Sequence, residues 1–211
     1  MGGRMTLMGA VVGVVLLVPC LARGQVGRRG DVLDVNTATE KQLASVPGLA
    51  QGLVKPLLAR RPFLTMTDLD AALPSLTPAQ RVEVYRRLFV QVNVNAAPDE
   101  ELQLVPGMTP TTAAAIRQGR PYKALAEFRK VVAAAVGEQG VATLEPFVFV
   151  PINLNTASDA DIMSIPRMGQ RMLREFKEYR PYKALAQFRR EIGKYVDARE
   201  VARLERYVTL E

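Results

Sequence analysis

The chain has 211 residues, of which 48% are hydrophobic and 23% charged, a balance typical of a folded globular protein. It contains no histidine and a single cysteine, Cys20, so histidine-based triads, His/Cys zinc sites and cysteine nucleophiles paired with histidine are excluded. Lys and Arg number 28 against 21 Asp and Glu, and the net charge of +7 favours an anionic partner. We therefore expect neither an enzymatic activity nor a cofactor.

Residues 1–24 have the pattern of a signal peptide. Arg4 precedes an uncharged, largely apolar stretch from Met5 to Ala22, and Ala22-Arg23-Gly24 places small residues where a signal peptidase would cleave. This pattern predicts export to the periplasm or the cell exterior. An uncleaved membrane anchor is the alternative, because the uncharged stretch of 18 residues is close to the length that spans a bilayer.

The rest of the chain repeats one pattern three times. Asn36, Asn95 and Asn155 are each followed by a proline 11 positions later, and 15 positions after that proline comes the proline of an Arg-Pro-aromatic sequence. Identical spacing in three copies predicts three tandem modules. Their predicted bounds are 31–90, 91–150 and 151–211.

Each module has the signals of several short helices. The sequences 39–42 and 158–161 are typical of capping boxes and open a first helix, which a proline ends at Pro47, Pro106 or Pro166. A tight turn and a second helix follow, up to the Arg-Pro sequence, and then a shorter and a longer helix. The sequences 89–92 and 147–150 favour extended connectors. The predicted fold class is therefore all-α, with helix, hairpin and helix at the start of each module.

Two recurrent features have structural interpretations. The aromatic residue of each Arg-Pro-aromatic sequence is expected to pack in the module core, while the proline ends a helix. The asparagines Asn36, Asn95 and Asn155 are expected to cap or brace the first helix by bonding to the backbone.

This order of motifs, Asn-x-Ala, helix, Pro-Gly turn and a helix ending at Arg-Pro, resembles the helix-hairpin-helix repeat of the ComEA family of competence DNA receptors. The resemblance implies an all-helical module outside the cytoplasmic membrane that binds double-stranded DNA without reading its sequence, as in DNA uptake. The module also resembles those used only for protein contact in an extrinsic subunit of photosystem II and a minor pseudopilin of type II secretion. A structural or protein-interaction scaffold of the cell envelope or a secretion system is therefore the alternative.

The hairpin and the start of the second helix are the predicted DNA-binding site. Free backbone amides there and the helix dipole favour a phosphate, and glycine lets the phosphate approach closely. Such contacts carry no base information. The predicted residues are Gly48, Ala50, Gln51 and Lys55 in module 1; Gly107, Thr109, Thr111 and Thr112 in module 2; and Arg167, Gly169, Gln170, Arg171, Arg174 and Lys177 in module 3.

The turns differ from the family pattern, which has glycine at two positions. Modules 1 and 2 keep the first glycine, and module 3 keeps only the second, with Arg167 at the first. Arginine fits there only if the position has a negative φ. Module 3 is expected to dominate DNA binding because it has 12 basic and 9 acidic residues. The charges that interleave along its last two helices are interpreted as ordinary intrahelical pairs.

Overall fold

The computed structural model describes residues 24–28 and 30–211. This part of the chain is mostly helical, as expected, with eleven α-helices and six strands of two residues each. Apart from Gly24, the expected signal segment 1–24 lies outside the described residues. No helix within the described ranges is long and apolar enough to cross a membrane.

Each module begins and ends with a short strand, and these two strands pair in parallel. Leu33 pairs with Leu88, Val92 with Val148, and Ile152 with Val208. The pairs are β1 (Leu33–Asp34) with β2 (Leu88–Phe89), β3 (Val92–Asn93) with β4 (Val148–Phe149), and β5 (Ile152–Asn153) with β6 (Val208–Thr209). The expected extended connectors thus contain β2, β3 and β4, and the strand pairing joins the two ends of each module.

Between the strands, each module has two short helices joined by a tight turn. These helices are α1 (Glu40–Ala44) and α2 (Gln51–Arg60), α5 (Asp99–Gln103) and α6 (Pro110–Gln118), and α8 (Asp159–Ser164) and α9 (Gln170–Glu178). The capping boxes predicted at Thr39 and Ser158 are both formed, and each first helix ends before its proline. Local side-chain chemistry therefore sets where these helices begin and end.

The second half of each module is helical, with lengths that differ from the expectation. Module 1 has α3 (Met66–Ala71) and α4 (Pro78–Tyr85), but in module 3 α10 (Leu185–Ile192) and α11 (Ala198–Glu205) both have 8 residues. In module 2, α7 (Leu125–Leu144) is one segment kinked at Gly137, where φ is 69° and ψ is 171°, followed by the 3-10 turn η1 (Glu145–Phe147). The expected order of a shorter and then a longer helix therefore holds only in module 1. In module 2, Gly137 stands where a turn separates the two helices of the other modules.

The Arg-Pro-aromatic sequence of each module contributes a buried ring and two backbone hydrogen bonds to the module interior. As expected, the rings of Phe63, Tyr122 and Tyr182 are buried. Asn36, however, does not brace the first helix: its side-chain amide donates to the carbonyl of Phe63 at 2.8 Å and accepts from the Phe63 amide at 2.7 Å. The same two bonds join Asn95 to Tyr122 and Asn155 to Tyr182. We call this pair of bonds in each module the asparagine clamp.

The arginine that precedes each cis proline adds to this clamp. The Arg120 guanidinium donates to the carbonyls of Val94 and Ala97, at 2.5 and 2.7 Å. Arg180 makes the equivalent bonds to Leu154 and Ala157. The loop that follows the first strand is thereby tied to the end of the second helix in the same module.

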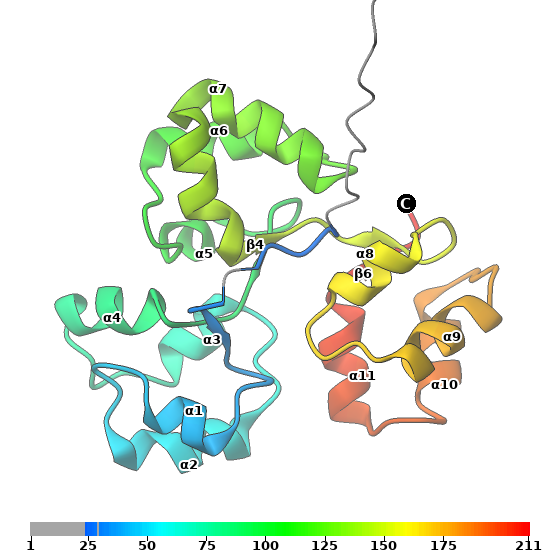
Figure 1. The fold of residues 1–211 in the computed structure, drawn as a ribbon, viewed down its shortest axis with the longest axis horizontal. Helices are drawn as coiled ribbons and strands as arrows, with labels where there is room; N and C mark the ends of the chain where they lie inside the picture. Colours follow the sequence, from blue (N-terminus) through cyan, green and yellow to red (C-terminus); the bar gives the residue numbers. More distant parts are fainter. Residues whose placement is uncertain (1–23, 29) are drawn as a thin grey trace, which may run out of the picture.

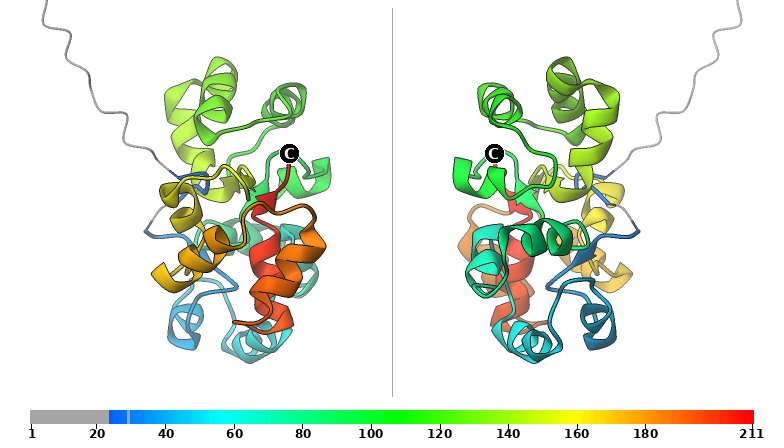
Figure 2. Two further views of the ribbon diagram at one scale, coloured as in Figure 1. Left: turned by 90° about the vertical axis from the view of Figure 1, so that its right-hand side faces the viewer. Right: turned by 90° about the vertical axis from the view of Figure 1, so that its left-hand side faces the viewer.

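The three modules form three lobes around a centre where the short strands lie (Figure 1). Module 2 lies above module 1 in Figure 1, module 3 lies beside them, and the side views in Figure 2 show the same separation of lobes. Buried side chains of modules 1 and 2 form one continuous core, and module 3 has a second core that also includes Val26 and Phe149.

The segment before module 1 joins modules 2 and 3. Val26 pairs antiparallel with Phe149, and the Gly27 amide donates to the Val148 carbonyl at 3.0 Å. The Val26 amide donates to the Ser164 hydroxyl of α8 at 3.3 Å. Residues 25–27 therefore act as a third strand on β4 and as a contact to module 3.

Candidate nucleic-acid interface

The first position of each hairpin turn has a positive φ in all three modules. The values are 79° at Gly48, 85° at Gly107 and 59° at Arg167. The condition under which arginine would fit easily, a negative φ, is therefore not met, and Arg167 is held in the left-handed region that disfavours a residue with a Cβ. A Cβ at Gly48 would lie 3.3 Å from Val84 of α4, so this turn also packs tightly against the last helix of its module.

The second turn position has ordinary extended geometry. Ala50, Thr109 and Gly169 are the N-caps of the second helices, with φ of −63°, −120° and −107°. Any residue adopts these angles, so the loss of glycine in modules 1 and 2 leaves the turn unchanged. A Cβ at Gly169 would meet no atom within 4 Å, which leaves open space beside the first turn of α9.

Module 1 presents an uncapped start of its second helix. Ala50 provides no side-chain acceptor for the first amides of α2. Gln51 is exposed, but its side-chain amide donates to the Ala44 carbonyl at 2.9 Å and so braces α1. Lys55 is exposed one turn further along. The hairpin of module 1 thus offers backbone amides, one exposed glycine and one lysine.

Module 2 offers much less to an anion. Pro110 occupies the first helical position and has no amide, while the Thr109 hydroxyl accepts from the Thr112 amide at 3.1 Å. Thr112 is only 1% exposed, so a ligand cannot reach its side chain. Thr112 is therefore not a DNA-contacting residue, contrary to the prediction. Gly107, Thr109 and Thr111 are exposed, but they lie where the helix start is already capped.

Module 3 gathers its predicted residues on one exposed surface. Arg167, Gly169 and Gln170 form the turn and the start of α9, and Arg171 and Arg174 follow on its exposed side. The Arg171 guanidinium lies over the Tyr195 ring, 5.5 Å from its centroid. Lys177 is also exposed but forms an ion pair with Asp159 at 2.6 Å.

The positive charges of module 3 fall into two groups. Many of those on the last two helices are neutralised: Arg203 pairs with Glu200 within α11, as expected, and Lys194, just beyond the end of α10, is bonded to Glu191. Arg189 instead pairs with Glu205 across α10 and α11. By contrast, no carboxylate among the described residues pairs with Arg167, Arg171 or Arg174. The hairpin and α9 therefore carry a cluster of three exposed cations that no carboxylate of the described residues compensates.

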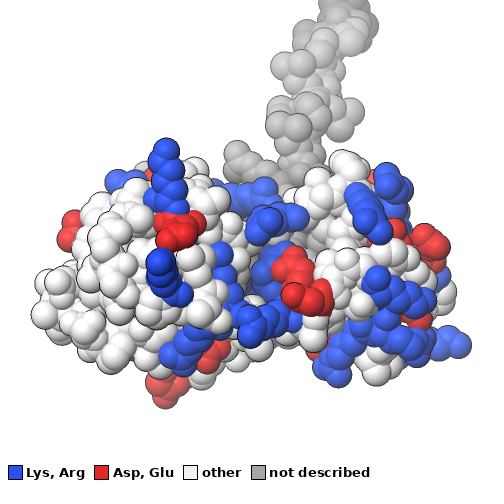
Figure 3. Space-filling model, turned by 90° about the horizontal axis from the view of Figure 1, so that it is seen from below, with Lys and Arg blue, Asp and Glu red and all other residues white. Residues whose placement is uncertain are grey.

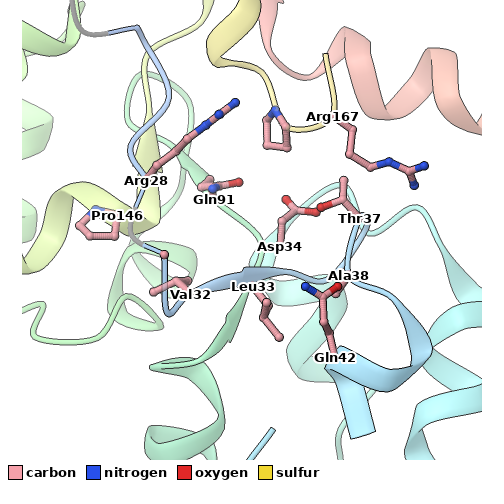
Figure 4. A pocket seen from close by; sticks show the side chains of 12 residues that line it. Arg28, Val32, Leu33, Asp34, Thr37, Ala38, Gln42, Gln91, Pro146 and Arg167 are labelled. Atoms are coloured by element: carbon pink, nitrogen blue, oxygen red, sulfur yellow. The ribbon is translucent and has the colours of Figure 1, made fainter. Parts of the chain in front are cut away.

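Sequence analysis missed a second basic feature, a cavity of about 320 Å³ between modules 1 and 3. Its lining includes Arg28 from the leading segment, Asp34 and Gln42 from module 1, Gln91 from the connector, and Arg167 from the third hairpin (Figure 4). The only sequence signal is Asp34 itself, because modules 2 and 3 have asparagine at this position. The cavity depends on how the modules pack, which the repeat pattern does not predict.

Asp34 is the single carboxylate in the cavity lining. Its Oδ1 accepts from the Asn36 amide at 2.8 Å, whereas Oδ2 is buried without a hydrogen-bond partner among the described residues. Burial raises the pKa of Asp34, although the nearby charges of Arg206 and Arg203 act in the opposite direction. Asp34 therefore gives only partial compensation for the arginines around it.

The two basic features lie on the same side of the molecule. Figure 3 shows Lys and Arg side chains on both lobes and along the hollow between them, with a few acidic side chains among them. The hairpin of module 3 connects the features, since Arg167 belongs to the exposed cluster and also lines the cavity.

Comparison with known proteins adds no assignment: no family model, curated protein or solved structure matches this chain.

Proposed function

We propose that this is an exported, non-enzymatic protein of three tandem helix-hairpin-helix modules that binds double-stranded DNA without sequence preference, as in DNA uptake. Phosphates of the duplex backbone bind to hairpin amides and to the basic residues beside them. Module 3 makes the main contribution, module 1 a smaller one, and module 2 very little.

The arrangement around α9 is the observation that carries this proposal. The helix start has no side-chain cap, the space beside Gly169 is open, and it is flanked by three exposed arginines that pair with no carboxylate in the part of the chain that the structure describes. Helix amides and dipole favour an anion at such a position, and the arginines add charge-assisted hydrogen bonds. Because these groups contact phosphate, they bind any duplex alike.

The first test is fluorescence anisotropy of a labelled 30-base-pair duplex titrated with the protein at several salt concentrations. A second duplex of unrelated sequence serves as the specificity control. We expect similar affinity for both and a slope of log affinity against log salt of about −0.9 for each phosphate contact. No binding to either duplex at low salt would overturn the proposal.

Charge reversal then locates the site. Arg171→Glu combined with Arg174→Glu removes two exposed cations beside the α9 start, and we expect affinity for both duplexes to fall on the order of tenfold or more. The matched control is Lys123→Glu with Lys130→Glu, which makes the same change in net charge at exposed positions of module 2. Equal losses in the two double variants would show that net charge, and not the α9 surface, governs binding.

Export has its own test. Expression of the full chain in a Gram-negative host followed by N-terminal sequencing of the periplasmic fraction should give a mature protein that begins near Gln25. Recovery of the intact N-terminus in the membrane fraction would favour the anchor instead.

The alternative of a protein-interaction scaffold is favoured by one observation in module 2. Its hairpin and α4 of module 1 enclose an apolar groove of about 350 Å³ that includes Met108 and Val82, and Val82 is 54% exposed. A scaffold that docks an envelope or secretion protein here predicts that Val82→Asp abolishes the association and leaves DNA affinity unchanged. Co-purification with the envelope fraction, compared between Val82→Asp and the Arg171/Arg174 double variant, separates the two functions.

A further inference from the structure

We infer that the cavity between modules 1 and 3 is a binding site for a phosphate group, attracted by the positive charge of arginines from the leading segment, module 1 and module 3. The inference rests on the proposed function only for the source of that phosphate. A duplex backbone would supply it in a DNA-binding protein, and a free polyphosphate has the same chemistry.

The charge around the cavity is strongly positive. Arg28 and Arg167 line it directly, and Arg61 and Arg206 lie close enough to Asp34 to interact with its charge. None of these four arginines forms an ion pair with a carboxylate within the described part of the chain.

The hydrogen bonds of Arg28, Arg61 and Arg206 go to neutral acceptors, which are backbone carbonyls except for the Tyr207 hydroxyl that accepts from Arg206 at 3.1 Å. Arg28 donates to the carbonyls of Met163 and Ser164, Arg61 donates to that of Ala38 at 2.6 Å, and Arg206 donates to that of Gln91. Carbonyl acceptors orient the guanidinium groups without cancelling their charge. Asp34 and the buried Glu101, which also faces Arg206, are the two acidic groups that offset them. An anion is therefore the ligand that the cavity favours.

Arg167 is the side chain most open to a ligand. Among the described residues it has no hydrogen-bond or ion-pair partner, and it is exposed at the cavity rim beside Thr37, with its guanidinium group pointing outward (Figure 4). Its φ of 59° is a conformation that glycine adopts more easily, and the other two modules have glycine at this turn position. An arginine retained at a position that disfavours it, beside a positively charged cavity, indicates a role for the guanidinium group.

A substitution of Asp34 provides a second test of the site, in which affinity is expected to rise instead of fall. Modules 2 and 3 have Asn93 and Asn153 at this position, and each asparagine accepts the same local bond from the amide two residues later. Asp34→Asn therefore keeps the turn and removes the one negative charge in the cavity lining. A phosphate should bind more tightly to this variant.

The experiment measures binding of the 30-base-pair duplex and of inorganic pyrophosphate to the full protein, by anisotropy and by thermal shift respectively. For Arg167→Gly we expect duplex affinity to fall about threefold to tenfold and the salt slope to lose about one phosphate contact, or 0.9. For Asp34→Asn we expect duplex affinity to rise and its salt slope to steepen. Lys130→Ala, which removes one exposed charge from module 2, should have a smaller effect than Arg167→Gly.

The outcomes separate the cavity from the proposed function. Duplex binding that is unchanged in both Arg167→Gly and Asp34→Asn overturns the cavity site and leaves DNA binding in place. If the duplex does not bind but pyrophosphate stabilises the wild type more than Arg167→Gly, the cavity binds a free phosphate compound and the proposed DNA function fails. No response to either ligand overturns both. Arg167→Lys, which keeps the charge, should restore part of the affinity lost in Arg167→Gly.

Discussion

Phe89 at the end of module 1 packs edge-to-face against Phe147 of module 2, with ring centroids 4.9 Å apart. Phe149 at the end of module 2 contacts Tyr207 of module 3 at the equivalent positions in a tilted arrangement, with centroids 4.7 Å apart. The last strand of one module thus supplies a ring that packs beside the last strand of the next. At the two ends of the series the pattern stops: Arg87 occupies the position of Phe147 and Tyr207, and Thr209 occupies that of Phe89 and Phe149. Polar residues therefore take the place of the ring at the outer position of the first and of the third module.

This aromatic joint predicts energetic coupling between modules 2 and 3. Phe149→Leu and Tyr207→Leu should each destabilise the protein, and the double variant should lose less than the sum of the two. We expect a coupling energy of about 0.5–1.5 kcal/mol from a double-mutant cycle in urea unfolding. Thr209→Ala has no ring partner to lose and serves as the control. Strictly additive effects of Phe149→Leu and Tyr207→Leu would show that the rings contribute only through their own burial.

The positive φ values at the hairpins predict opposite effects of two substitutions on stability. Arg167→Gly should raise the free energy of unfolding by about 1 kcal/mol, since it relieves a left-handed residue with a Cβ. Gly48→Ala should lower it by a similar amount or more, because it introduces that strain and places a Cβ 3.3 Å from Val84. Urea titration of both variants checks the pair. A loss of stability in Arg167→Gly would mean that the guanidinium contributes more to folding than the backbone strain costs.

The asparagine clamp is expected to be a major local contribution to module stability. Asn95→Ala removes two hydrogen bonds to the Tyr122 backbone, both 2.8 Å long, and leaves that amide and carbonyl without their partner. The expected cost is about 2–3 kcal/mol in the free energy of unfolding. Asn95→Asp keeps the acceptor but not the donor and should fall between Asn95→Ala and the wild type. An Asn95→Ala variant as stable as the wild type would contradict a stabilising role for the clamp.

Glu101 predicts a pH dependence of stability. It is 5% exposed, and its Oε1 accepts from the Met66 amide of module 1 at 2.8 Å. Burial raises the pKa of Glu101 above its ordinary value of 4.5, so the folded protein holds this proton more tightly than the unfolded chain does. The contribution of Glu101 to stability should therefore fall as the pH rises above 4.5 toward the raised value.

The variant Glu101→Gln isolates this effect. Glutamine keeps an oxygen acceptor for the Met66 amide but does not ionise, so the difference in unfolding free energy between wild type and variant should shift in favour of the variant as the pH rises. Asp34 has a pKa raised in the same direction, and it is present in both proteins, so its contribution cancels. Urea titrations at pH 4 to 8 measure the difference, and a constant value across that range would contradict the prediction.

The sequence alone was sufficient for the features that depend on neighbours within a turn or two of chain. Thr39 and Ser158 open helices through capping boxes, and the prolines at 47, 106 and 166 follow the ends of first helices as predicted. The buried rings after each Arg-Pro sequence were also predictable. Side-chain acceptors for free amides, and the missing amide of proline, act over three or four residues, so a local pattern is enough to identify them.

The tertiary structure decided what depends on distant residues and on the packing of modules. Asn36 binds a backbone 27 positions away, Glu101 caps a helix of the neighbouring module, and Arg167 adopts a left-handed angle that its sequence context did not predict. The cavity around Asp34 exists only because modules 1 and 3 meet there. These contacts are set by the relative orientation of the lobes, and that orientation follows from the packing of buried rings and charges at the joints, which the 60-residue repeat does not encode.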